Sequence, residues 1–207
     1  MRRRWAFGWT TAGILGVWSL HNAVLHPIEA ARFPPEQLEP ALLGLRALVW
    51  FGPALLYLRR YEPRPLREVF ALLPSSPRGV WVGLAPGLGL LALAALLIGP
   101  PAALPAGPGA VAALLVGVLL EELLLRGFVF GQLALGWSGG RVVLATALLF
   151  AGAHLPGWWG EGMSMEAIIP SFVVLLLFGL AHGFARWKSG WVGASVLLHL
   201  LQNLLAG

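Results

Sequence analysis

The sequence predicts an all-α membrane protein, a polytopic bundle of about seven transmembrane helices with a polar site between its C-terminal helices. Three observations lead to this fold class. The chain of 207 residues is 58% hydrophobic and 11% charged, which lies outside the range of an ordinary soluble domain. The apolar residues gather in runs of about 20, the length that crosses a bilayer as a helix. The basic residues stand at the ends of these runs, as in chains that cross a membrane several times.

Seven apolar runs can be followed along the chain. The predicted helices are Trp5 to Leu25, Ala41 to Arg59, Gly79 to Gly99, Gly109 to Leu135, Arg141 to Leu155, Ala167 to Ala185 and Gly190 to Ala206. The fifth run is short, which predicts a helix with little tilt or one that packs against protein more than lipid.

The distribution of basic residues predicts the orientation. Arg2 to Arg4 precede the first run, four arginines follow the second, and Arg186 and Lys188 separate the last two. The three connections on the other side hold Arg32 as their one fixed cation. By the positive-inside rule the N-terminus is cytoplasmic and, after seven spans, the C-terminus lies outside.

Composition also excludes some partners and chemistries. The net charge of +5 is not gathered on a basic stripe interleaved with aromatic residues, so we expect no nucleic-acid partner. The chain has no cysteine, which excludes a disulfide, a thiolate nucleophile and a cysteine-based metal site.

The N-terminal run and the middle of the chain bear on domain organisation. The first run resembles a signal peptide, but Trp18, His21 and Asn22 interrupt it and no small-residue cleavage site follows, so we expect it to remain as a helix. A Pro/Gly/Ala-rich stretch, 100–109, predicts a loop. It divides three N-terminal helices, residues 1–108, from a four-helix part, residues 109–207.

Two adjacent carboxylates, Glu121 and Glu122, lie inside one of the most apolar stretches, with Arg126 four residues after the second. An ionisable cluster inside a membrane indicates a functional site, because burying charge there is costly. Glu122 and Arg126 form an i,i+4 pair in the favoured orientation, which is equally compatible with a structural ion pair. Glu121 points about 100 degrees around the helix from Glu122, so it is the candidate general base.

Two later segments repeat the four-residue spacing. Phe150 and His154 share one helix face, and His199 and Asn203 share another. An imidazole and a carboxamide on one face offer two directed donors, as the stabilisation of an oxyanion requires. A lone histidine is more often structural, so His21, His26 and His182 are assigned interfacial or packing roles. The pair Trp158 and Trp159 predicts an interfacial anchor first and a substrate contact second.

Several protease and nucleotide-binding classes are excluded. The sequence has no His-Glu-x-x-His zinc motif, no Gly-x-Ser-x-Gly elbow, no phosphate-binding loop and no aspartate at all. Its 27 glycines are spread through the runs, a distribution that favours close helix packing over phosphate binding.

The ordered motifs resemble those of a known family. Glu121-Glu122-x-x-x-Arg126-Gly127, then Phe150-x-x-x-His154, then His199-x-x-x-Asn203 are similar to the three motifs of the CPBP family. That family comprises the type II CAAX prenyl endopeptidases and their bacterial relatives, also called the abortive-infection family. The resemblance covers about the last hundred residues.

The resemblance implies that the chain is an intramembrane endopeptidase and a multi-pass membrane protein. The bacterial members of the family suggest that it lies in a prokaryotic inner membrane. The resemblance also implies that Glu121 activates a water with help from His154, and that His199 and Asn203 hold the oxyanion. Glu122, Arg126 and Phe150 would support them. Two histidines and a glutamate could bind zinc, but the family is described as glutamate-type, so we expect no cofactor and no metal.

The sequence leaves the substrate and two other functions open. The expected partners are the lipid bilayer and a membrane-embedded peptide or protein substrate, for which prenylated C-termini, bacteriocin leaders, sorting-signal tails and anti-sigma factors all fit. A non-catalytic immunity or secretion-partner protein of the same fold is the main alternative. A proton-coupled transporter that uses Glu121 and His154 as a relay is a third, which the absence of an internal repeat disfavours.

Overall fold

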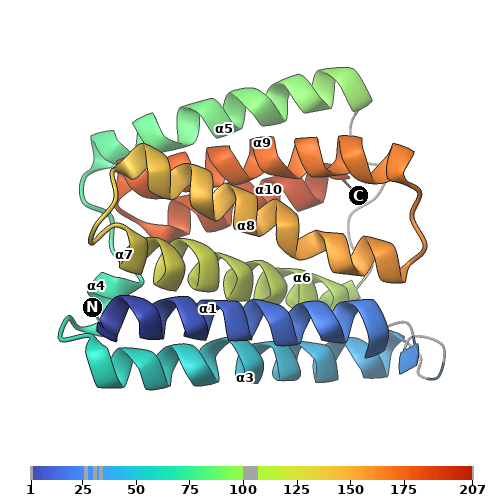
Figure 1. The fold of residues 1–207 in the computed structure, drawn as a ribbon. Helices are drawn as coiled ribbons and strands as arrows, with labels where there is room; N and C mark the ends of the chain where they lie inside the picture. Colours follow the sequence, from blue (N-terminus) through green and yellow to red (C-terminus); the bar gives the residue numbers. More distant parts are fainter. Residues whose placement is uncertain (1, 26–27, 30–31, 33–34, 100–106, 207) are drawn as a thin grey trace.

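The computed structural model describes residues 2–25, 28–29, 32, 35–99 and 107–206, and over these residues it contains helices and no strand (Figure 1). Seven helical rods lie side by side. They are α1 (Arg2–Leu20) continued by the π-helix η1 (His21–Leu25), α3 (Pro35–Tyr61), α5 (Pro77–Ile98), α6 (Gly107–Glu122) continued by the π-helix η2 (Leu123–Val129) and α7 (Phe130–Leu133), α8 (Gly139–Gly160), α9 (Met165–Ser189) and α10 (Val192–Ala206). A short helix, α4 (Leu66–Val69), lies between α3 and α5. The predicted bundle of about seven helices is confirmed.

Five of the rods are long and apolar enough to cross a membrane. They are 21 to 27 residues long with mean hydropathy between 1.4 and 2.1, and they comprise α3 from Ala41, α5, the α6–α7 rod, α8 and α9. Helix α10 is apolar but shorter, and α1 begins with three arginines. The chain is therefore an integral membrane protein.

Helix α8 is longer than predicted. The apolar run predicts an end at Leu155, one residue before Pro156, and proline lacks the N–H of a helical hydrogen bond. Helix α8 instead continues through Pro156 to Gly160, so the connection to α9 is shorter than predicted. Proline is tolerated in membrane helices because neighbouring groups satisfy the freed backbone. The loop predicted at 100–109 lies largely outside the described residues, which resume at Gly107.

Two larger apolar cores and a smaller one, formed by Phe130, Val142 and Val143, lie between the rods. Figure 1 shows α1 and α3 on one side, α5 on the other, and the α6–α7 rod and α8 between them. One core joins α1, α3 and η2 through residues such as Trp18, Trp50 and Phe128. The second joins α5, α9 and α10, with Phe178 and Leu198 at its centre. The polar site lies where α6, α8 and α10 meet between these cores.

Small residues bring the C-terminal helices close together. A Cβ on Gly179 of α9 would lie 3.1 Å from the Cα of Ala147 on α8. A Cβ on Gly83 of α5 would lie 2.8 Å from the carbonyl oxygen of Ala185 on α9. Close backbone approach at small residues is typical of helix packing in membranes, and it confirms the predicted packing role for Gly83 and Gly179. A Cβ on Gly152 of α8 would instead meet nothing within 4 Å.

Charge is separated between the two ends of the bundle. Most basic residues belong to the end at which α1 begins and α3 ends, where Glu62 and Glu68 are the accompanying acids. These basic residues are Arg2, Arg3, Arg4, Arg59, Arg60, Arg64, Arg67, Arg78, Arg141, Arg186 and Lys188. The opposite end carries Arg32 and five glutamates, Glu29, Glu36, Glu39, Glu161 and Glu166. This asymmetry is the pattern described by the positive-inside rule.

Glu62, just beyond the end of α3, ties three segments together at the basic end. Its side chain is 1% exposed and accepts hydrogen bonds from Arg64 at 2.9 Å, from the Gln132 amide at 2.7 Å and from Arg3. The Arg64 hydrogen bonds, more than the opposing effect of burial, lower the pKa of Glu62 to about 2. The carboxylate therefore holds α1, α3 and α7 together more strongly when it is ionised than when it is protonated.

This network predicts an acid-dependent loss of stability. The pKa of Glu62 is lower in the folded protein than its ordinary 4.5, so its stabilising effect is complete above that value and declines as the pH falls toward 2. The thermal unfolding midpoint of the detergent-solubilised protein should fall between pH 5 and 3. Glu62→Gln should lower the midpoint at pH 7 and reduce this dependence, whereas Glu68→Gln, at an exposed acid of the same end, should do neither. Matching pH profiles for Glu62→Gln and the wild type would contradict the assignment.

Candidate active site

Glu122 and Arg126 form a fully buried ion pair in the middle of the bundle. Both side chains have no exposed surface, and Nη1 of Arg126 donates to Oε1 of Glu122 at 3.2 Å. Nη2 of Arg126 donates to the carbonyl oxygen of Gly179 on α9 at 3.1 Å. Because a buried charge without a partner costs several kcal/mol, these contacts fix the α6–α7 rod against α9.

A change of helix type places Arg126. Helix α6 ends at Glu122, and the π-helix η2 follows for seven residues. A π-helix has wider turns than an α-helix and often occurs at functional sites. Gly127 permits the wide turn to lie against α4, because a Cβ there would be 2.6 Å from the ring of Phe70. Arg126 can thus contact Glu122 and the Gly179 carbonyl together.

His199 on α10 connects the two glutamates. Its Nδ1 lies 2.9 Å from Oε1 of Glu122, and its Nε2 lies 3.9 Å from Oε2 of Glu121. A carboxylate only accepts hydrogen bonds, so Nδ1 carries a proton when Glu122 is ionised. The Nε2 atom of His199 is then the ring position that faces Glu121.

Glu121 has a different environment from Glu122. Its side chain is 19% exposed, and its Oε1 accepts a hydrogen bond from Nη1 of Arg46 on α3 at 3.0 Å. The Arg46 guanidinium lies over the rings of Trp18 and Trp50, at 4.8 and 5.2 Å from their centroids. Such cation–π contacts orient the guanidinium. Arg46 therefore completes a chain in which basic and acidic side chains alternate, Arg126–Glu122–His199–Glu121–Arg46, which we call the polar chain.

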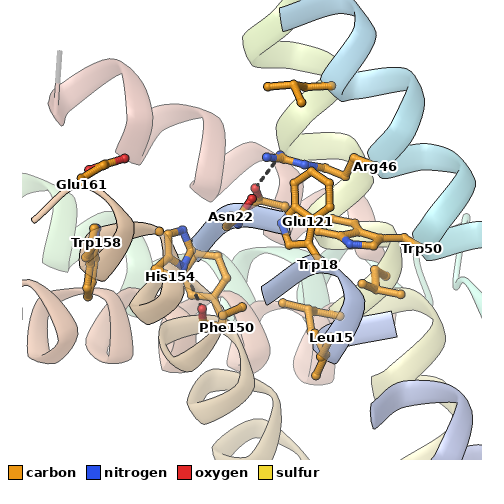
Figure 2. Close-up of a pocket in the computed structure, with 15 residues that line it drawn as sticks. Leu15, Trp18, Asn22, Arg46, Trp50, Glu121, Phe150, His154, Trp158 and Glu161 are labelled. Carbon is orange, nitrogen blue, oxygen red and sulfur yellow. Dashed lines mark hydrogen bonds and ion pairs between the residues drawn. The ribbon is translucent and has the colours of Figure 1, made fainter. Parts of the chain in front are cut away.

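A cavity of about 230 Å³ opens beside the polar chain. Figure 2 shows Arg46, Trp18 and Trp50 on one side of it and His154 and Trp158 on the other, with Glu121 between them. Its walls come from α1, η1, α3, α6, η2 and α8. The cavity therefore brings Glu121 and His154 to one space, as the sequence predicts for these two residues.

The proton on His154 can be assigned from its contact. Nδ1 of His154 lies 2.8 Å from the carbonyl oxygen of Phe150, one turn earlier in α8. A carbonyl oxygen only accepts, so Nδ1 is the donor. In the neutral ring Nε2 then has a free lone pair, which is the form of imidazole that accepts a proton.

Phe150 lies at the centre of the site. Its ring centroid is 4.7 Å from the guanidinium carbon of Arg126, and it makes edge contacts with the rings of His154, His182 and His199 at 5.1 to 5.8 Å. Phe150 is 1% exposed. Its ring lies between the buried ion pair and His154, and it packs α8 against the histidines of α9 and α10.

His182 and Asn203 differ from what their sequence context suggests. His182 on α9 is fully buried, stacks on His199 at 5.0 Å and has its Nδ1 3.5 Å from Oε1 of Glu122. His182 therefore has the packing role predicted from the sequence, but its neighbours are the site residues His199 and Glu122. Asn203 lies one turn after His199 and is half-buried, and its side chain has no hydrogen bond or ion pair with another residue that the structure describes. Neither Asn203 nor His199 lines the cavity.

Three side chains could in principle bind a metal ion. Ligand atoms of Glu122, His182 and His199 lie within 4.8 Å of one another, and all three residues are buried. However, Oε1 of Glu122 already faces Arg126 and His199 at hydrogen-bonding distance. A divalent cation on that oxygen would lie beside the Arg126 guanidinium, whereas Oε2 of Glu122 has no hydrogen-bond partner among the described residues. His154 is not part of this group.

The sequence predicts part of this arrangement. The three motifs place Glu121 beside His154 and His199, and the Glu122–Arg126 pair is present as predicted. Arg46 was missed because it lies far away in the chain and in no motif with Glu121; its position in an apolar run was the available signal. His182 was missed because its polar neighbour at helical spacing, Arg186, belongs to none of the three motifs.

Comparison with known proteins agrees with these motifs. Residues 104–205, about half of the chain, match a family model described as type II CAAX prenyl endopeptidase Rce1-like. No curated protein and no solved structure matches the chain. The matched part contains all three motifs, the π-helix η2 and every residue of the polar chain except Arg46. This half of the chain belongs to the Rce1-like family of type II CAAX prenyl endopeptidases, a family of membrane proteases.

Proposed function

We propose that the chain is an intramembrane endopeptidase that hydrolyses a peptide bond of a membrane-embedded or lipid-anchored protein, with water activated by Glu121. The supporting observation is the contrast between the two glutamates. Glu122 is fully buried among donors, whereas Glu121 borders a cavity that also contains His154. A general base must reach its water, and only Glu121 is placed to do so.

The proposed reaction begins with a water molecule in the cavity. Glu121 accepts one proton from this water, and the water oxygen forms a bond to the scissile carbonyl carbon. Nε2 of His154 faces the same cavity and helps to hold or accept the proton. The carbon–nitrogen bond then breaks, the proton passes to the leaving nitrogen, and the products are a carboxylic acid and an amine.

His199 and Asn203 are proposed to stabilise the oxyanion. They lie one turn apart on α10, and His199 already contacts both glutamates. Donation from Nε2 to the oxyanion requires a proton on each ring nitrogen, with Glu122 as acceptor at Nδ1. Glu122 would thus orient His199, and Arg126 and Phe150 would hold Glu122 and the rings in place.

The setting of the reaction follows from the bundle. The charge asymmetry of its two ends supports a cytoplasmic N-terminus, and the family's bacterial members suggest a prokaryotic inner membrane. The substrate is proposed to be a membrane-embedded peptide or protein. The family's printed description makes a prenylated C-terminus the first substrate to test.

The roles of the two glutamates can be separated by mutation. Glu121→Gln should lower turnover of a farnesylated peptide reporter by about 100-fold or more, the typical contribution of a general base, with an unchanged unfolding midpoint. Glu122→Ala should lower the midpoint as well, because it leaves Arg126 buried and unpaired at a cost of about 3 to 5 kcal/mol. Catalytic defects of equal size in both variants, without loss of stability in either, would overturn this division of roles.

Metal dependence is tested separately. If Glu121 and His154 activate the water themselves, turnover should survive prolonged chelation, and elemental analysis of the purified protein should show no stoichiometric zinc. Glu122→Gln serves as a second test, because loss of a ligand would lower zinc content together with activity. Turnover that is lost with chelator and restored by zinc would instead assign His182 and His199 as ligands.

The oxyanion role of Asn203 predicts a specific kinetic pattern. Removal of one preorganised donor costs about 3 to 4 kcal/mol in the transition state, or about 100- to 1000-fold in turnover. Asn203→Ala should lower kcat by that factor with little change in KM, because the donor acts on the transition state. Asn203→Asp should be worse, since a carboxylate repels the oxyanion. A near wild-type kcat, or a defect confined to KM, would assign Asn203 to packing or substrate binding.

A further inference from the structure

A second cavity lies at the basic end of the bundle, far along α1 from the polar chain. It has a volume of about 400 Å³ and is lined by Arg3, Arg4, Tyr57, Gln132 and Trp137 among others. Nη2 of Arg3 donates hydrogen bonds to the side chains of Glu62 and Gln132. Arg4 makes no hydrogen bond or ion pair with any residue that the structure describes, and a Cβ on Gly136 would lie 3.3 Å from its Nη2. The cavity is thus lined by two arginines, of which Arg3 has hydrogen-bond partners and Arg4 has none among the described residues.

An apolar groove continues from this cavity along α1. It is lined by residues of α1, the α6–α7 rod and α8, and it shares Phe7, Leu133 and Trp137 with the basic cavity. Beyond them, the groove reaches Ala12 and Leu15 on α1 and Leu148 on α8. A basic cavity thus opens into an apolar groove on a surface that faces the bilayer.

The dimensions of the two features match one lipid leaflet. Arg4 and Leu15 are 11 positions apart in α1, which corresponds to about 16 Å at 1.5 Å per residue. The hydrocarbon core of a bilayer is about 30 Å thick, so the groove runs to about half of that depth. A partner helix that crosses the membrane would need a contact surface along the whole of α1, and the groove does not extend that far.

We propose that this cavity and groove bind one anionic phospholipid from the bilayer. The phosphate would lie between Arg3 and Arg4, near the indole of Trp137, and one acyl chain would occupy the groove between α1 and α8. Arginine is well suited to bind phosphate, and tryptophan is enriched at the headgroup level of membranes. The proposal rests on the membrane-spanning fold and not on the proposed protease activity.

Native mass spectrometry of the detergent-solubilised protein with added lipid tests the headgroup. The wild type should retain one phosphatidylglycerol molecule and should retain phosphatidylcholine with the same chains less well. Arg4→Gln should weaken phosphatidylglycerol retention about fivefold, the equivalent of about 1 kcal/mol per basic residue at a membrane surface. Arg67→Gln removes the same charge from an exposed position of the same end, outside the cavity, and should retain the lipid. Equal retention of the two lipids, or equal losses in the two variants, would overturn the site.

A second pair of variants tests the acyl chain. Ala12→Trp should fill the groove and displace the lipid, whereas Val17→Trp, on an exposed part of α1 that does not line the groove, should not. Lipid binding that is indifferent to Ala12→Trp would refute the chain site. A dimer peak that Ala12→Trp removes would show that the groove holds a second copy of the chain, and would overturn the proposal.

Discussion

The whole site depends on the burial of the Glu122 carboxylate. An isolated charge at that depth is costly, and its partners must surround it in a fixed geometry to offset that cost. Arg126 and His199 donate to one of its oxygens, and Arg126 also donates to the Gly179 carbonyl. One carboxylate therefore joins the α6–α7 rod to α10 directly and to α9 through Arg126. The close packing of α8 on α9 at Gly179 brings Phe150 and His154 into the same arrangement.

The sequence was sufficient to predict the helices and the pairs within them. Apolar runs locate all seven rods, five of which are long and apolar enough to cross a membrane, and a four-residue spacing correctly places Arg126 beside Glu122. The predicted end of α8 at Leu155 was wrong, because a membrane helix can continue through a proline where neighbouring groups satisfy its backbone. The π-helix η2 was not predictable either, since its seven residues, one of them an arginine, would also suit an ordinary helix.

Contacts between helices were harder to predict for a physical reason. Spacing along one helix determines which residues share its face, but not which face of another helix lies opposite. His199 could be connected to Glu121 only through a resemblance between ordered motifs. Arg46 and His182 belong to no such motif, so their contacts with Glu121 and Glu122 emerge only from the packed bundle. The proposed roles of His154 and His199 rest on their contacts with the site, and that of Asn203 rests on its spacing from His199 and on the motif resemblance.

The two neighbouring glutamates also explain why the first helices matter to the site. The hydrogen-bond partners of Glu122, Arg126 and His199, both belong to the part that matches the family, 104–205. Glu121 is held from outside it, by Arg46 of α3, which in turn lies against Trp18 of α1 and Trp50. The same three residues form one wall of the cavity. A C-terminal half on its own would keep the buried ion pair but would leave the cavity open on that side and Glu121 without its cation. The position of the proposed base therefore depends on helices that carry none of the three motifs.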